Sequence, residues 1–291
     1  MGLFDVGPIV WIQGVFGPGW EAPFRVVTVL GSTWGLILVG GLAFWLWGRR
    51  LLYGILALAA VEAVVKLAVA SVAAVPRPPA GEVIKYESIE AYTSFPSGHV
   101  SSATAMWAYP GFLGKIPLAV GIGIGLLVAV TRLYLGVHWL VDVLGGLAIG
   151  LLLAWLVSRG HAALVEHAER VPTAAWFAVG AVLAAVALAA TAWIGPAPPK
   201  WTALGFLAGL GVGLPVERRW IDYDPGAPGV LAALVRTIVG WAGIGLCLWW
   251  ARSGGDGALL LHAVTAFAAT IWALVVAPAI FQATAVGTER G

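Results

Sequence analysis

Residues 116–158 read IPLAVGIGIGLLVAVTRLYLGVHWLVDVLGGLAIGLLLAWLVS, two long apolar runs separated by a short turn at 134–137. Each run has about the 20 residues with which a helix crosses roughly 30 Å of hydrocarbon. Inside a bilayer a backbone polar group finds no water, so it must be bonded within its own segment, as it is in a helix. This stretch therefore predicts two membrane-spanning helices.

The composition of the whole chain agrees with that prediction. Of its 291 residues, 60% are apolar and 10% are charged, whereas a soluble domain usually has about 25% charged residues. Cys247 is the only cysteine, which excludes a scaffold of disulfides within the chain. We expect an all-α fold, a polytopic transmembrane helix bundle. The net charge of +2 does not point to nucleic acid, and we expect no such partner.

Working outward from this stretch, we find about nine segments that are apolar enough to be spans. They lie at 24–48, 51–75, 97–113, 116–134, 138–158, 172–194, 200–216, 227–251 and 257–282. Three parts follow from this layout: an interfacial N-terminal segment at 1–23, a core bundle at 24–158, and additional C-terminal transmembrane helices at 159–291. Arg236 falls inside the eighth span, and the sequence identifies no partner for it.

The basic residues of alternate loops predict the orientation. One set of loops holds eight: Arg49, Arg50, Lys115, Arg159, Arg170, Arg218, Arg219 and Arg290. The opposite set holds six: Arg25, Arg77, Lys85, Arg132, Lys200 and Arg252. Because cytoplasmic loops carry the excess of basic residues, we expect the N-terminus outside and the C-terminus in the cytoplasm.

Glycines recur in several of the apolar segments, for example in Gly146-x-x-x-Gly150 and Gly205-x-x-x-Gly209. A phosphate-binding glycine loop follows a strand and precedes a helix. Here the flanks are apolar spans, so the pattern favours close packing between helices.

Three clusters of polar residues lie in or beside the apolar segments, where polar side chains are unfavourable in a membrane protein. The first runs from Lys66 to Arg77-Pro78, the second is Phe95-Pro96-Ser97-Gly98-His99, and the third runs from Thr131 to Asp142. In the predicted topology all three reach the same outer face, two in the loop after the second span and one between the fourth and fifth. Their convergence predicts a site there.

The residues of the third cluster are spaced so that their side chains can interact. His138 and Asp142 are four residues apart, so on a helix they share a face, where the carboxylate can bond one imidazole nitrogen. That bond fixes the tautomer and leaves the other nitrogen free as a nucleophile or base. Arg132 lies across the break at Gly136 and can fold back over the same place.

The second cluster is typical of a helix start. Pro96 restricts the backbone, Ser97 is a good N-cap, and Gly98 allows close approach. The free N–H groups of a helix start bind anions, and His99 would face an anion bound there.

Two histidines, one carboxylate and three cations suit a phosphoryl group, whose transition state spreads negative charge that cations and N–H donors stabilise. The competing interpretation is zinc, since two histidines and an aspartate can ligate it. Three cations at the same place would repel the metal, so we favour phosphate. Taken singly, each residue also has a structural interpretation: the arginines could reach toward headgroups, and Lys66 could simply neutralise Glu62 four residues earlier.

The three clusters together resemble the motifs of the type-2 phosphatidic-acid phosphatase superfamily. That superfamily includes lipid phosphate phosphatases, undecaprenyl-diphosphate phosphatases, sphingosine-phosphate phosphatases, glucose-6-phosphatases and vanadium haloperoxidases. The match covers roughly residues 50–158; it is complete at Pro-Ser-Gly-His and, in the third cluster, has Thr131 in place of the usual serine. The nine-span layout resembles the glucose-6-phosphatase and sphingosine-phosphate phosphatase branch.

One position departs from the family pattern. The family places its lysine seven positions before the arginine, which would fall on Ala70, whereas Lys66 lies eleven before Arg77. Because seven and eleven residues are close to two and three helical turns, Lys66 keeps the same face one turn deeper. Three alternatives remain: the helix unwinds before Pro76, Lys85 substitutes, or the contact is missing.

The resemblance implies a two-step hydrolysis without a metal or other cofactor. His138 would form a phosphohistidine while Asp142 holds its ring, and His99 would protonate the leaving oxygen and then activate water. The resemblance assigns substrate binding to Lys66, Arg77, Ser97, Gly98 and Arg132.

We expect a phosphatase embedded in the membrane, with lipids around it and its site on the non-cytoplasmic or lumenal side. The expected substrate is a lipid phosphate: a polyprenyl phosphate or diphosphate, a phosphatidate or a phosphosphingoid base. A soluble phosphate such as a hexose phosphate is one alternative, and a lipid-phosphate binding or transport protein without turnover is the other. The C-terminal helices could form a homodimer surface.

Overall fold

The computed structural model describes residues 4–87, 93–191, 197–255 and 257–284, and these residues form helices and connections with no strand among them. The all-α expectation is thus confirmed for this part of the chain. The chain divides into two compact units. Unit 1 comprises Met1–Leu36 and Gly54–Ala162, and unit 2 comprises Ile37–Tyr53 and Ala163–Gly291.

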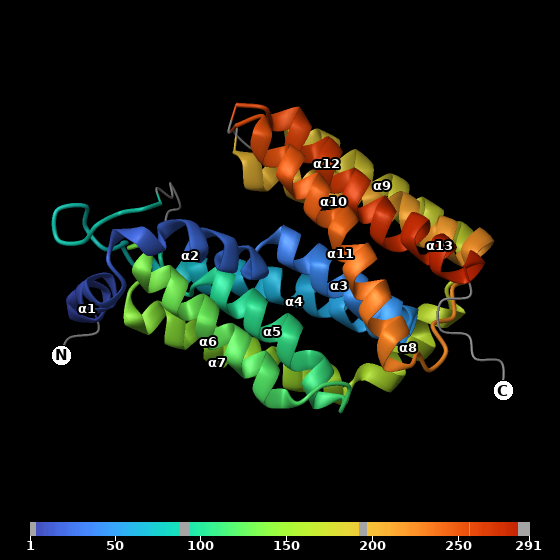
Figure 1. The fold of residues 1–291 in the computed structure, drawn as a ribbon, viewed down its shortest axis with the longest axis horizontal. Helices are drawn as coiled ribbons and strands as arrows, with labels where there is room; N and C mark the ends of the chain where they lie inside the picture. Colours follow the sequence, from blue (N-terminus) through green and yellow to red (C-terminus); the bar gives the residue numbers. More distant parts are fainter. Residues whose placement is uncertain (1–3, 88–92, 192–196, 256, 285–291) are drawn as a thin grey trace. The chain divides into compact units, whose positions relative to one another are not determined.

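Unit 1 begins with short helical segments and continues into longer helices. Its elements are α1 (Gly7–Phe16), η1 (Pro18–Trp20), α2 (Glu21–Val27), η2 (Thr28–Gly31), the start of α3 (Thr33–Trp47), most of α4 (Arg49–Ala73), α5 (Gly98–Phe112), α6 (Leu118–Tyr134) and α7 (Leu140–Arg159). The helix α5 packs against both α6 and α7, and the three lie side by side (Figure 1).

Glycines allow this close approach. A Cβ atom added to Gly121 would lie 2.5 Å from the backbone of Ala108, and one added to Gly150 would lie 2.6 Å from the carbonyl oxygen of Ser101. At Gly146 the distance to the carbonyl oxygen of Ser97 would be 2.8 Å. The glycines of α6 and α7 therefore pack against the backbone of α5, as small residues do between membrane helices.

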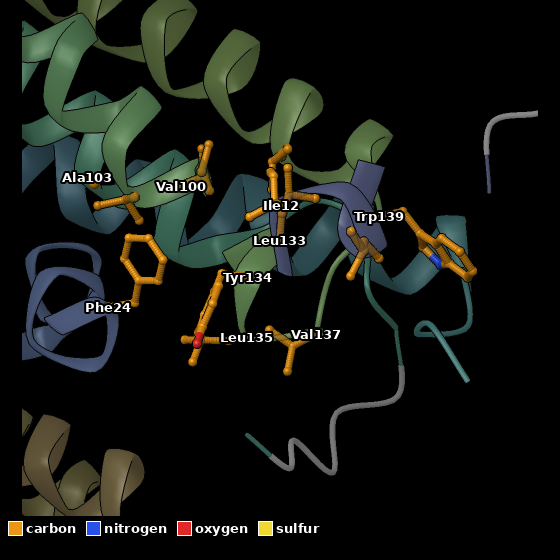
Figure 2. Packing of buried hydrophobic residues seen from close by; sticks show 13 residues of the cluster. Ile12, Phe24, Val100, Ala103, Leu133, Tyr134, Leu135, Val137 and Trp139 are labelled. Atoms are coloured by element: carbon orange, nitrogen blue, oxygen red, sulfur yellow. The ribbon is translucent and has the colours of Figure 1, made fainter. Parts of the chain in front are cut away.

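A buried apolar cluster closes the end of unit 1 where α6 ends and α7 begins. Figure 2 shows its side chains, which come from α1, α2, α5, α6, α7 and the turn between the last two. Ile9 and Ile12 of α1 are buried in it, whereas Trp11 on the other face is 68% exposed. The N-terminal helix therefore packs against the bundle with one face. The opposite face, which carries Trp11, is the one that would lie at the membrane interface if the predicted interfacial position is correct.

Unit 2 contains the remaining helices. They are α8 (His161–Arg170), α9 (Thr173–Thr191), α10 (Pro198–Val216), η3 (Glu217–Ile221), α11 (Val230–Ser253), α12 (Leu259–Ile271), η4 (Trp272–Val276) and α13 (Ala277–Ala283). The helix α10 packs against α9 and α12, and α12 packs against α11. The buried Arg236 donates to the carbonyl oxygens of Trp45 at 3.2 Å and Pro225 at 2.9 Å, which gives this residue the partners that the sequence did not reveal.

Four helical segments in the described part of the chain are long and apolar enough to cross a membrane: Arg49–Ala73, Leu140–Arg159, Val230–Ser253 and Leu259–Ala283. A fifth span is possible where Pro18–Gly31 and Thr33–Trp47 meet at 61°, which is within the predicted span 24–48. The integral-membrane character is therefore supported. Nine spans and the orientation of the termini stay predictions.

We predict that Gly121→Ala weakens the pairing of α5 and α6. The added methyl group would meet backbone that cannot move aside, and overpacking of this kind costs about 1–3 kcal/mol. The melting temperature in detergent should fall. Gly123→Ala is the matched control, because a Cβ atom there meets nothing within 4 Å. Equal melting temperatures for the two variants would contradict this packing.

Candidate active site

The three polar clusters meet at one end of unit 1. The indole Nε1 of Trp139 donates to the carbonyl oxygen of Pro76 at 2.7 Å, which joins the first cluster to the third. The backbone N–H of Ser97 donates to the carbonyl oxygen of Asp142 at 3.1 Å, which joins the second to the third. The convergence predicted from topology is therefore present in the fold.

His138 and Asp142 contact each other, but not as two residues on one helical face. His138 precedes α7, whose N-cap is Trp139, and Asp142 is the third residue of that helix. Its Oδ2 accepts the backbone N–H of Trp139 at 2.8 Å and lies 3.3 Å from Nδ1 of His138. Capping of the helix start thus places the carboxylate beside the imidazole. Nδ1–H then donates to Asp142, and Nε2 is left with its lone pair.

The turn before His138 requires a glycine. Gly136 has φ +72°, a left-handed conformation, and a Cβ atom there would clash with the carbonyl oxygen of Ile84. The predicted break at this residue therefore has two physical causes. It follows the end of α6 at Tyr134, two residues after Arg132, and returns the chain toward α7.

Arg132 is completely buried. Its Nη1 donates to Oε2 of Glu87 at 2.8 Å and to Oγ1 of Thr28 at 3.1 Å, while Nε and Nη2 have no partner. One edge of the guanidinium is therefore fixed by the protein. The other edge keeps two free donors.

Arg77 reaches the same place from the connection after α4. Its Nη1 donates to the carbonyl oxygen of Val137 at 2.7 Å and lies 3.4 Å from Nε2 of His138, and its Nη2 donates to the carbonyl oxygen of Thr93 at 3.2 Å. The buried Nε has no partner. A cation thus stands directly beside Nε2 of His138, within hydrogen-bonding distance of its lone pair.

The start of α5 adds further donors. Ser97 is the N-cap, fully buried, and its hydroxyl has no partner. Gly98 and His99 follow in the first turn, where backbone N–H groups have no intrahelical acceptor. His99 is half-buried at this helix start, next to the glycine that Lys66 approaches.

Lys66 lies against Gly98. A Cβ atom added to Gly98 would be 2.9 Å from Cδ and 3.4 Å from Nζ of Lys66. The helix α4 ends at Ala73, so the chain leaves the helix before Pro76, as one of the three alternatives requires, and Lys85 is exposed. The longer spacing to Arg77 therefore still brings the ammonium group to the start of α5.

Burial determines the charge state of His138. It lowers the pKa of this side chain to about 4, against the opposing effect of its hydrogen bond with Asp142. The imidazole is consequently neutral at pH 7, and Nε2 is available to attack an electrophile.

Unpartnered polar atoms gather in this region. Of the eight buried side-chain nitrogen and oxygen atoms without a hydrogen bond among the described residues, five belong to predicted site residues: Nε of Arg77, Oγ of Ser97, Nε and Nη2 of Arg132, and Oδ1 of Asp142. Buried polar groups normally have partners, so each exception needs an explanation. Four of the five are donors, which an oxyanion would satisfy. In the described ranges no group of three or more histidine, cysteine or acidic side chains is arranged to hold a metal ion.

Sequence reasoning missed three contributors. Gln13 of α1 donates to the carbonyl oxygens of Ile84 at 2.7 Å and Tyr134 at 2.8 Å, and it accepts the N–H of Ile84 at 3.1 Å. It thereby ties the N-terminal helix to both connections that carry site residues. Thr28 and Glu87 hold Arg132, as described above. The only sequence signal was a glutamine on the buried face of an apolar helix.

Comparison with known proteins agrees with the family that the motifs resemble. A family profile described as "PAP2 superfamily" matches residues 47–166, and a second, described as "PAP2 superfamily phosphatase, transmembrane extension", matches residues 201–289. Phosphatidylglycerophosphatase B of Bacillus subtilis (strain 168) is 43% identical over 82 residues, which cover 23% of this chain and 39% of that relative. The chain thus matches about two fifths of the relative's length. No solved structure matches it at a significant level.

We predict that Ser97→Ala separates ligand binding from stability. Removing a buried hydroxyl that has no partner should leave the melting temperature of the empty protein unchanged or slightly higher. The affinity for orthovanadate, a phosphoryl mimic, should fall roughly tenfold through the lost hydrogen bond. Thermal-shift titration with vanadate measures both quantities. Ser158→Ala, at a half-buried serine of α7 outside the site, should change neither. A destabilised variant with undiminished vanadate affinity would contradict the assignment.

Proposed function

Because the chain belongs to the PAP2 superfamily, we propose that it hydrolyses a phosphate ester or diphosphate of a membrane lipid on the non-cytoplasmic face, without a metal. One observation carries the proposal: Arg77, Ser97 and Arg132, from the three clusters that meet at His138, each have a buried donor without a partner, and Nη1 of Arg77 lies 3.4 Å from Nε2 of this histidine. The Nε2 atom of His138 is the nucleophile, and Arg77, Arg132 and Ser97 supply the donors.

These donors suit the transition state of phosphoryl transfer. Its negative charge spreads over three equatorial oxygens, and donors already in place stabilise it without reorganisation. The guanidinium of Arg132 cannot turn away, because Glu87 and Thr28 hold its other edge. Nε and Nη2 form a planar fork that matches two phosphoryl oxygens.

In the first step Nε2 of His138 attacks phosphorus. The P–N bond forms as the bond to the ester oxygen breaks, and the leaving oxygen takes a proton from His99. Asp142 accepts from Nδ1–H throughout, so it stabilises the positive charge that develops on the ring.

In the second step water attacks the phosphohistidine. His99, now neutral, takes a proton from the water, the new P–O bond forms, and the P–N bond breaks. The electron pair returns to Nε2 of His138 and phosphate leaves. His99 thus acts as acid and then as base, so it must enter the first step protonated.

The surroundings of Lys66 favour a lipid. Its side chain is 42% exposed, and the neighbouring outward residues of α4 are apolar: Val64, Leu67 and Val72 are all well exposed. Because α4 is a candidate span, this surface suits acyl or prenyl chains. A headgroup could then reach the start of α5 while its chains stay in the bilayer. The name of the related phosphatidylglycerophosphatase B is compatible with such a substrate.

We expect His138→Ala and His99→Ala each to lower the rate of phosphate release by roughly 10³-fold or more, since each removes a group that acts on the reacting atoms. Release of inorganic phosphate from dioctanoyl phosphatidate in detergent measures this, with melting temperature and vanadate binding as checks of folding. His167→Ala, at a histidine in α8 outside the site, is the matched control. Activity that survives both catalytic substitutions would favour a binding or transport protein.

Substrate preference forms a separate prediction. The wild-type protein should release phosphate from dioctanoyl phosphatidate, phosphatidylglycerophosphate or farnesyl diphosphate with a kcat/KM at least about 100-fold above that for glucose 6-phosphate, because buried apolar chains contribute about 0.8 kcal/mol per CH₂. Assays of the four compounds side by side in one detergent test this. A preference for glucose 6-phosphate would show that the substrate is a soluble phosphate and not a lipid, while the proposed two-step mechanism would still apply.

A further inference from the structure

The contact between α4 and α5 includes a carboxylate that belongs to no motif. We propose that Glu62 is a positioning residue of the site: it holds the ammonium group of Lys66 against the first turn of α5. This inference rests on the proposed function, because it concerns how a substrate-binding cation is placed. Glu62 itself would not touch the substrate.

Three contacts align α4 antiparallel to α5. Near one end, a Cβ atom on Gly54 would clash with the hydroxyl of Tyr109. Halfway along, the hydroxyl of Ser101 donates to Oε1 of Glu62. At the end that carries the site, Lys66 lies against Gly98. The only carboxylate of α4 therefore lies in the contact between the two helices, one helical turn from the site.

Glu62 is only 3% exposed although α4 is apolar. An ionisable side chain inside a span is costly unless it is paired, and it often has a function. Its Oε1 accepts from Ser101, and its Oε2 lies 3.9 Å from Nζ of Lys66. The Ser101 hydroxyl also lies 3.2 Å from the carbonyl oxygen of Gly98. One carboxylate thus contacts both the cation and the turn that the cation approaches.

Lys66 needs such a partner. Its side chain is long, and its half-exposed position would let the ammonium group turn outward toward headgroups and water. The carboxylate one turn deeper attracts the ammonium inward, and the missing side chain of Gly98 leaves it room. This arrangement explains how a lysine eleven residues before Arg77 serves a site whose relatives have their lysine one turn nearer.

A purely structural role for Glu62 makes a different prediction. If the carboxylate only joined the helices, its loss would lower stability and affect the site independently of Lys66. If it only neutralised Lys66, its loss would lower stability and leave substrate binding unchanged. If it acts through Lys66, its effect on substrate binding must vanish once Lys66 is removed. A double-mutant cycle distinguishes the two roles.

The experiment compares Glu62→Gln, Lys66→Met and the double variant, with phosphate release from dioctanoyl phosphatidate and inhibition by vanadate as readouts. Glu62→Gln should raise KM and the vanadate inhibition constant roughly tenfold, the effect of one hydrogen bond to a charged group, with kcat changed less than about threefold. The double variant should match Lys66→Met alone. Glu166→Gln, at an exposed acid of α8, is the control and should behave as wild type.

Three results would overturn the inference: an unchanged KM in Glu62→Gln, effects that multiply in the double variant, or a loss confined to kcat and melting temperature. If Glu62→Gln does not fold, Glu62→Asp retains the charge on a shorter side chain, and its rise in KM should likewise disappear in the Lys66→Met background. Failure of the proposed function would look different, because wild-type protein would then release no phosphate that depends on His138.

Discussion

A cation buried in an apolar bundle must have a counter-charge, and this requirement organises the end of unit 1. Removing the partner of a buried charge costs several kcal/mol, so Arg132, which is fully buried, depends on Glu87. In the pair of Lys66 and Glu62 the buried charge is the carboxylate, since the Lys66 side chain is 42% exposed. The third carboxylate at this end, Asp142, lies beside His138.

The scaffold that keeps these charges in place comes from segments far apart in the chain. Gln13 joins the N-terminal helix to Ile84 and Tyr134, and the N–H of Tyr86 donates to the carbonyl oxygen of Leu135 at 3.2 Å. The connection that carries Glu87 and the turn that precedes His138 are thereby bonded to each other. The apolar cluster of Figure 2 packs beneath them. Loss of the N-terminal helix would therefore affect the geometry of the site.

Local patterns could be predicted from the sequence, whereas contacts between segments could not. Apolar runs predicted the helices, and a spacing of four residues predicted the pairing of His138 with Asp142. The pairing is present, but it is the capping of the start of α7 that brings the two side chains together. The reach of Lys66 depends on how closely α4 approaches α5, which no spacing encodes. The partner of Arg132 is a loop residue, 45 positions away. The predicted first span contains a bend of 61°, which average hydropathy cannot detect.

The hydrogen bonds of the two arginines show which of their donors remain available to a ligand. Nη1 of Arg132 donates to Glu87 and Thr28, which leaves its Nε and Nη2 without partners. Both terminal nitrogens of Arg77 donate to backbone oxygens, which leaves its Nε without a partner. Buried donors without acceptors lower stability, and proteins keep such deficits chiefly where a ligand supplies the missing acceptor. A bound oxyanion would satisfy both arginines and the Ser97 hydroxyl at once. Binding of an oxyanion to these donors would therefore raise the stability of the bundle.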